Sequence, residues 1–260
     1  MTDLETQYSP SSRAGGSADP YLADYRARSA TARAQLGSRV VEVGEGTLLV
    51  AADAPAPLLV FVHGGYWQAL SAQESMYLAT GAVAQGWSFA AIEYTLAPAA
   101  TVPTMIGECR AALAALARSI APTGAVLAGH SAGAQLAAMV SLANSAPFPI
   151  ERTVLVSGVF DLRPLVGTTV NAPLHLDEAE AAQLSPMLLP VRGGARAVVA
   201  WGDNDTEAFA TQSRDYAAHL AAGGAIVESL ECAGRHHFDI VDDLVDPSTA
   251  LGRLTLGVAA

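Results

Sequence analysis

The stretch of sequence that decides the fold reads Leu127-Ala128-Gly129-His130-Ser131-Ala132-Gly133. An apolar run precedes it and a helical run, 134–142, follows it, so a G-x-S-x-G pattern lies where a strand turns into a helix. The two glycines leave room for a serine in a strained turn, with its hydroxyl clear of the backbone. We therefore predict that Ser131 is a nucleophile. The alternative is a turn of small residues whose glycines only allow close strand–helix packing.

Around this motif, short apolar runs alternate with longer amphipathic runs, which is typical of a mostly parallel sheet covered by helices. The predicted strands are 39–43, 47–51, 58–62, 88–94, 125–128, 152–157, 197–201 and 225–230. The predicted helices are 21–36, 72–84, 103–120, 131–144, 207–221 and 238–245. Together with the strand–serine–helix turn, this order predicts the α/β-hydrolase fold, with a mostly parallel twisted sheet and helices on both faces.

The composition predicts one large domain over residues 1–260. Hydrophobic residues make up 51% of the chain and charged residues 15%, which supplies a large core and excludes a disordered protein. We expect residues 1–36 to form an N-terminal surface and helical segment. Residues 161–190 contain four prolines and are longer than a simple connection needs, so we expect them to cover a site as a lid.

Charge and hydropathy restrict the partners of the chain. A net charge of −11 argues against nucleic acid, because phosphate binding needs a basic patch. The first residues lack the pattern of a signal peptide, and no apolar run is long enough for a membrane span. We expect a soluble, cytoplasmic protein that binds a small-molecule substrate, and the sequence leaves a homodimer open. The two cysteines, Cys109 and Cys232, are predicted to be buried free thiols.

A second glycine motif, His63-Gly64-Gly65-Tyr66-Trp67, follows the predicted strand 58–62. In this fold the N–H of the residue after the nucleophile, here Ala132, needs a second donor from an earlier loop. Adjacent glycines let backbone N–H groups point inward, so Gly64 and Gly65 are the candidates that complete an oxyanion hole with Ala132. Each such donor contributes about 3–4 kcal/mol of transition-state stabilisation. The alternative is a tight turn followed by core aromatic residues.

The acid and the base follow the nucleophile in this fold, in that order. Asp203 and Asp205 come after the predicted strand 197–201, and either could reach a histidine. We favour Asp205, because by that residue the loop has turned toward the carboxyl edge of the sheet. His236 and His237 follow the last strand, and adjacent side chains cannot both face Ser131. These residues alone do not decide between the two histidines.

Other kinds of site are not indicated. No spacing of histidine and carboxylate residues resembles a zinc motif, and neither a G-x-G-x-x-G nor a Walker pattern occurs. We therefore expect no metal and no cofactor.

Several stretches resemble the kynurenine formamidase (arylformamidase) family, which lies near the hormone-sensitive-lipase-like esterases. They are Leu4-Glu5-Thr6-Gln7-Tyr8-Ser9-Pro10-Ser11, His63-Gly64-Gly65-Tyr66-Trp67, Gly129-His130-Ser131-Ala132-Gly133, 157–165, 202–213 and His237-Phe238-Asp239-Ile240-Val241. The resemblance covers nearly the whole chain. It implies Asp205 as the acid and His237 as the base.

The resemblance also implies a reaction, the hydrolysis of N-formyl-L-kynurenine to formate and L-kynurenine in tryptophan catabolism, through a formyl-enzyme on Ser131. Tyr66 and Trp67 would then form an aromatic wall for the substrate, with core packing as the alternative for Trp67. A carboxylesterase acting on small acyl esters would use the same machinery, so it stays open as an alternative function. A hydrolase fold that serves only as a ligand receptor is a third possibility, although such proteins usually lack a member of the triad.

Overall fold

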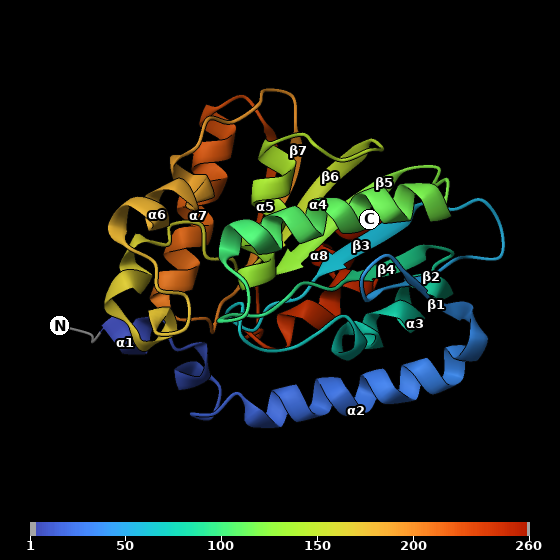
Figure 1. Ribbon diagram of the computed structural model, residues 1–260, viewed down its shortest axis with the longest axis horizontal. Helices are drawn as coiled ribbons and strands as arrows, with labels where there is room; N and C mark the ends of the chain where they lie inside the picture. The colour runs from blue at the N-terminus through green and yellow to red at the C-terminus, as the bar shows by residue number, and fades with distance from the viewer. Residues whose placement is uncertain (1–3, 259–260) are drawn as a thin grey trace.

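The computed structural model describes residues 4–258, which contain one eight-stranded sheet in the order β1-β2-β4-β3-β5-β6-β7-β8. Its strands are β1 Val40–Val43, β2 Thr47–Val50, β3 Leu58–Val62, β4 Ser88–Ile92, β5 Ala125–His130, β6 Ile150–Val156, β7 Arg196–Gly202 and β8 Ile226–Cys232. In this spatial order, each neighbouring pair from β4 through β3 to β8 is parallel. By contrast, β2 is antiparallel to both β1 and β4. The predicted α/β-hydrolase fold is confirmed (Figure 1).

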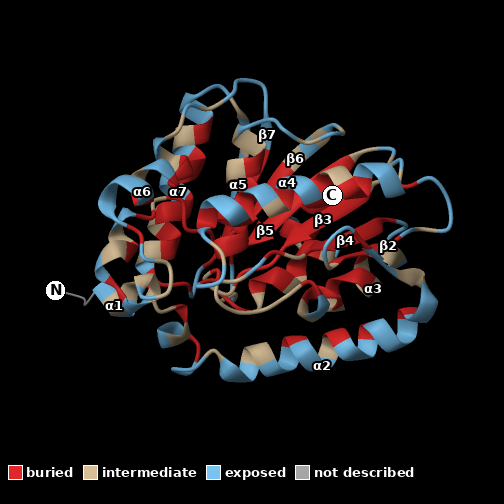
Figure 2. Ribbon diagram, viewed as in Figure 1, coloured by how far each residue is buried: buried red, intermediate tan, exposed pale blue. Residues whose placement is uncertain are grey.

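Helices cover both faces of this sheet (Figure 1). The α-helices are α1 Leu4–Gln7, α2 Asp19–Leu36, α3 Tyr77–Ala84, α4 Val102–Ser119, α5 Ala132–Leu142, α6 Glu178–Gln183, α7 Glu207–Ala222 and α8 Ala250–Leu256. Side chains alternate across β3, so Val60 packs with α4 and α5 on one face while Leu59 packs with α3 on the other. Figure 2 shows the central strands buried between these layers, with α2 exposed along its outer side.

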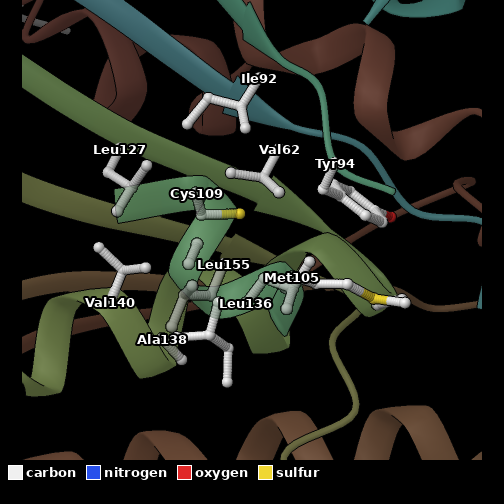
Figure 3. Close-up of a cluster of buried hydrophobic side chains, with 14 of the residues drawn as sticks. Val62, Ile92, Tyr94, Met105, Cys109, Leu127, Leu136, Ala138, Val140 and Leu155 are labelled. Atoms are coloured by element: carbon white, nitrogen blue, oxygen red, sulfur yellow. The ribbon is translucent and has the colours of Figure 1, made fainter. Parts of the chain in front are cut away.

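The core under α4 and α5 is apolar (Figure 3). Leu127, Leu136 and Met105 pack there around Cys109. Burial raises the pKa of the Cys109 thiol to about 12, and the pKa of Cys232 is raised to about 12 for the same reason. Both cysteines are free and buried, as predicted, and at neutral pH they are unreactive thiols.

Some elements differ from the prediction. Residues 238–245 do not form an α-helix; Ile240–Val245 is a 3-10 helix. The predicted helix 72–84 is divided into a 3-10 turn, Gln73–Ser75, and α3. The segment 161–190 contains α6 and several 3-10 turns, and α8 near the carboxyl end was not predicted. Among the helices of residues 4–258, none is both long enough and apolar enough to cross a membrane.

Candidate active site

Ser131 lies at a strained turn between β5 and α5. Its backbone has φ 54° and ψ −121°, a conformation that costs energy for a residue with a side chain. The glycines on either side are needed for close packing. A Cβ on Gly133 would lie 2.2 Å from the Val62 carbonyl oxygen, and one on Gly129 would lie 2.3 Å from the Gly133 oxygen. The sequence thus forces the chain to present Ser131 at the carboxyl edge of the sheet.

Asp205 and His237 come from the loops after β7 and β8 and meet at the same edge. His237 Nδ1 donates to Asp205 Oδ1 at 3.1 Å. Burial alone would raise the pKa of the Asp205 carboxyl. The nearby His237 and the hydrogen bonds from His237 and Ser157 outweigh that effect, so this pKa lies below its usual value. Asp205 is therefore an ionised, buried partner for the imidazole.

Ser131 and His237 both line one cavity of about 360 Å³. Among the described residues, no hydrogen bond joins the Ser131 hydroxyl and the His237 imidazole, so proton transfer requires the two side chains to come within hydrogen-bond distance. Such bonds are often long without substrate and shorten when it binds.

The two competing residues lie elsewhere. Asp203 accepts a hydrogen bond from the Gly234 N–H at 2.9 Å, which makes it a turn residue. His236 Nδ1 is 3.4 Å from an Asp239 oxygen, and its ring packs edge-on against Tyr21. Neither side chain is placed to join Ser131 and His237, so the geometry favours Asp205 and His237 over their neighbours.

The loop after β3 lies directly against the serine. A Cβ on Gly64 would be 3.0 Å from the Ser131 Cβ, so only glycine fits there without displacement. Gly65 has φ 94°, and a Cβ on it would lie 2.2 Å from the Ala69 oxygen. Among the described residues, the N–H groups of Gly64, Gly65 and Ala132 donate to no backbone or side-chain acceptor. These three N–H groups are the candidates for holding an oxyanion.

Sequence comparison supports the resemblance over nearly the whole chain. Kynurenine formamidase from Danio rerio is 33% identical over 98% of this chain and 94% of its own length. The Salmo salar enzyme of the same name is also 33% identical, over 98% of this chain and 95% of its own length. The chain belongs to the kynurenine formamidase family. The BD-FAE family matches residues 48–158, and esterase LipQ of Mycobacterium tuberculosis is 28% identical over 71% of this chain and 51% of its own length.

Solved structures agree with the fold of this formamidase-family chain. A candidate thioesterase from Silicibacter sp. superimposes with a TM-score of 0.85 at 29% identity, covering 99% of this chain and all of its own. An esterase from Pyrobaculum calidifontis gives a TM-score of 0.72 at 16% identity, covering 93% of each chain, which supports the fold alone. With this fold and its membership of the kynurenine formamidase family, the protein is a serine hydrolase.

The two aromatic residues after Gly65 have different places in this formamidase-family fold. Tyr66 lines the cavity, and its hydroxyl donates to the Tyr8 carbonyl oxygen at 2.5 Å. Trp67 is fully buried, and its Nε1–H donates to Gln135 Oε1 at 3.2 Å. Of the two alternatives for Trp67, the structure therefore places it in the core and not in the wall of the cavity. We correct the substrate-binding prediction for Trp67 accordingly.

Two buried residues at the site were not found from the sequence. Ser157 follows β6 with φ 46°, and its hydroxyl donates to Asp205 Oδ2 at 2.6 Å. His130 lines the cavity, and its Nε2 lies 2.8 Å from the His237 carbonyl oxygen. Burial, with a smaller effect of His237, lowers the pKa of His130 to about 3, so this ring is neutral. No sequence pattern predicts a positive φ at a serine. His130 occupies a variable position of the G-x-S-x-G motif, so the motif does not indicate a role for its side chain.

Residues of the N-terminal segment also form part of the cavity wall. Tyr8, Pro10 and Tyr25 line the cavity together with Thr169 and Val170 from the segment 161–190. Glu5 of α1 accepts hydrogen bonds from the Thr169 N–H, at 3.0 Å, and from the Thr169 hydroxyl. These contacts join the two segments over the site. That the segment 161–190 acts as a lid stays a prediction.

Proposed function

We propose that the chain hydrolyses aryl formamides, and that its substrate is N-formyl-L-kynurenine, which gives formate and L-kynurenine. The cavity over Ser131 is the observation that carries this proposal. Its walls include the aromatic side chains of Tyr8, Tyr25, Tyr66 and Phe238. Such walls suit an aryl ring, because a ring–ring contact contributes about 0.5–1.5 kcal/mol beyond its buried area. The similarity to kynurenine formamidases over nearly the whole chain supports the same substrate.

In the first proposed step, the Ser131 hydroxyl oxygen attacks the formyl carbon while His237 Nε2 accepts its proton. Asp205 keeps the other ring proton on Nδ1 and stabilises the imidazolium that forms. The negative oxygen of the tetrahedral intermediate accepts hydrogen bonds from the backbone of Ala132 and of the Gly64–Gly65 loop.

The intermediate then breaks its C–N bond. His237 gives its proton to the departing aniline nitrogen, L-kynurenine leaves, and the formyl group remains on Ser131 as an ester. In the second half, a water molecule attacks the formyl carbon while His237 accepts a proton from it. His237 then gives this proton to the Ser131 oxygen as the bond between that oxygen and the formyl carbon breaks, which releases formic acid, ionised to formate at neutral pH, and restores the enzyme without a cofactor.

The alternative is a carboxylesterase, which the similarity to esterase LipQ favours. Comparing kcat/KM for N-formyl-L-kynurenine with that for p-nitrophenyl acetate separates the two. We expect the formamide to be the better substrate. If the ester is processed tenfold better, a transition-state difference of about 1.4 kcal/mol, the formamidase proposal is wrong. A fluorophosphonate that labels the wild-type protein, but not Ser131→Ala, separates either enzyme from a ligand receptor.

A further inference from the structure

His63, the first residue of the oxyanion loop, has a buried ring nitrogen without a partner. The imidazole is 1% exposed, and its Nδ1 lies 2.9 Å from the Gly64 carbonyl oxygen. A carbonyl oxygen only accepts hydrogen bonds, so Nδ1 carries a proton. Within residues 4–258, Nε2 is buried and has no hydrogen-bond partner. A nitrogen buried in this way is costly unless something nearby satisfies it.

A carboxylate lies close to that nitrogen. His63 Nε2 lies 3.7 Å from Glu93 Oε1, which is within the range of an ion pair but longer than a hydrogen bond. Two backbone N–H groups fix this carboxylate: Ala72 N–H donates to Oε2 at 3.0 Å, and Tyr94 N–H donates to Oε1 at 3.3 Å. In a neutral His63 protonated on Nδ1, the electron-rich Nε2 would lie 3.7 Å from a carboxylate oxygen, which is repulsive. A protonated Nε2 would place positive charge at the same distance, which is attractive.

Hydrogen bonds connect His63 to the proposed oxyanion donors. The Gly64 carbonyl that accepts from His63 belongs to the peptide whose N–H is that of Gly65. The Tyr94 hydroxyl lies 3.1 Å from this oxygen and 3.0 Å from the His63 oxygen, which belongs to the peptide of the Gly64 N–H. A donor at a peptide oxygen polarises the N–H at the other end of that peptide. A charged donor does so more strongly than a neutral one.

We propose that Glu93 keeps His63 as a buried imidazolium, and that this cation strengthens the Gly65 N–H as an oxyanion donor by polarising the Gly64–Gly65 peptide. The proposed effect on catalysis rests on the proposed role of the Gly64–Gly65 loop as an oxyanion hole. His63 and Glu93 are positioning residues, since neither belongs to the described residues that line the substrate cavity.

Other charged groups lie near the pair. Glu45, Glu108 and Arg118 line a hollow beside Glu93 and Tyr94. Glu108 accepts hydrogen bonds from the Thr95 N–H and hydroxyl, both at 2.8 Å. The ring of Tyr94 stacks on His63 with 4.2 Å between centroids. Glu93 is therefore the carboxylate that faces Nε2, and Glu45 provides a matched control on the same hollow.

Nitrogen NMR of the ¹⁵N-histidine-labelled protein tests the charge directly. At pH 7.5 we expect both ring nitrogens of His63 to give resonances of protonated nitrogens, with their assignment taken from the signals lost in His63→Gln. Glu93→Gln should convert His63 to a neutral ring with one unprotonated nitrogen, because the charge is removed while an amide N–H can still face Nε2. Glu45→Gln should leave both signals unchanged. A neutral His63 in the wild-type protein would overturn the proposal.

Steady-state kinetics test the proposed effect of the His63–Glu93 pair on catalysis. Glu93→Gln should lower kcat about tenfold with KM within twofold, less than the 10²–10³-fold loss that removal of a whole oxyanion donor causes. Glu45→Gln should keep the wild-type kcat. An imidazolium at His63 together with an unchanged kcat in Glu93→Gln would refute the polarising role. The NMR result does not depend on activity, so failure of the proposed substrate or oxyanion loop is distinguishable from failure of the charge pair.

Discussion

Three side chains carry the proposed chemistry, so their replacement should have the largest effects. Ser131→Ala and His237→Ala should each lower kcat about 10⁴-fold or more, because they remove the nucleophile and the proton carrier. Asp205→Asn should lower kcat by about 10⁴, because an amide favours the wrong tautomer of His237. Asp203→Asn is the control, since Asp203 only accepts a turn hydrogen bond from Gly234. If Asp203→Asn causes the larger loss of kcat, the acid is misassigned.

Ser157 should matter for stability, because its hydroxyl donates to the second oxygen of a buried carboxylate. Ser157→Ala leaves Asp205 Oδ2 without that donor, so the free energy of unfolding at pH 7 should fall by about 1–3 kcal/mol. The matched control is Ser213→Ala. Ser213 is fully buried on α7, and its hydroxyl has no partner among the described residues. Urea unfolding of both variants tests this, and equal losses would contradict the assignment.

At the scale of elements, the contact between α5 and the end of β3 positions the nucleophile. Gly133→Ala places a Cβ 2.2 Å from the Val62 oxygen and 2.3 Å from the His63 oxygen, both backbone atoms. We expect thermal unfolding to show a loss of about 1–3 kcal/mol from this overpacking. Gly107→Ala in α4 is the same change in a helix with nothing within 4 Å, and it should stabilise the protein by about 0.5–1 kcal/mol. Stabilisation by both variants would show that the contact is not tight.

The same elements show what the sequence alone can predict. Strands such as β3 are buried on both faces, and their continuous Val, Leu and Phe residues identified them with bounds that hold to within a few residues. The sequence predicts an α-helix over 238–245 where the structure has the 3-10 helix Ile240–Val245, because the apolar spacing fits both forms. At the site, chain order located the acid and base segments. Which of Asp203 and Asp205 meets His237 depends on the path of a turn, and local propensity does not contain that information.

At the scale of the whole molecule, the buried, neutral ring of His130 should make the free energy of unfolding depend on pH. His130 has its folded pKa lowered to about 3, from about 6.5 in an unfolded chain, chiefly by burial. Below pH 6.5 the unfolded chain therefore binds a proton at this residue that the folded protein does not bind. Stability must then fall as the pH falls from 6.5 toward 3, by up to about 1.4 kcal/mol for each pH unit.

The carboxylate that pairs with His237 contributes at lower pH. The pKa of Asp205 is also lowered, so its stabilisation is present above its unfolded pKa of about 3.9 and is lost below it. Between pH 6.5 and about 4.5, comparison with a variant that lacks this ring isolates the loss from His130, because the other titrating groups are common to both proteins. We expect His130→Gln, which cannot titrate, to have a smaller dependence of unfolding free energy on pH than the wild-type protein in this window. Urea unfolding at pH 7, 6 and 5 measures the two slopes. Equal slopes would mean that His130 takes up its proton without unfolding, which is incompatible with its burial between Ser131 and His237.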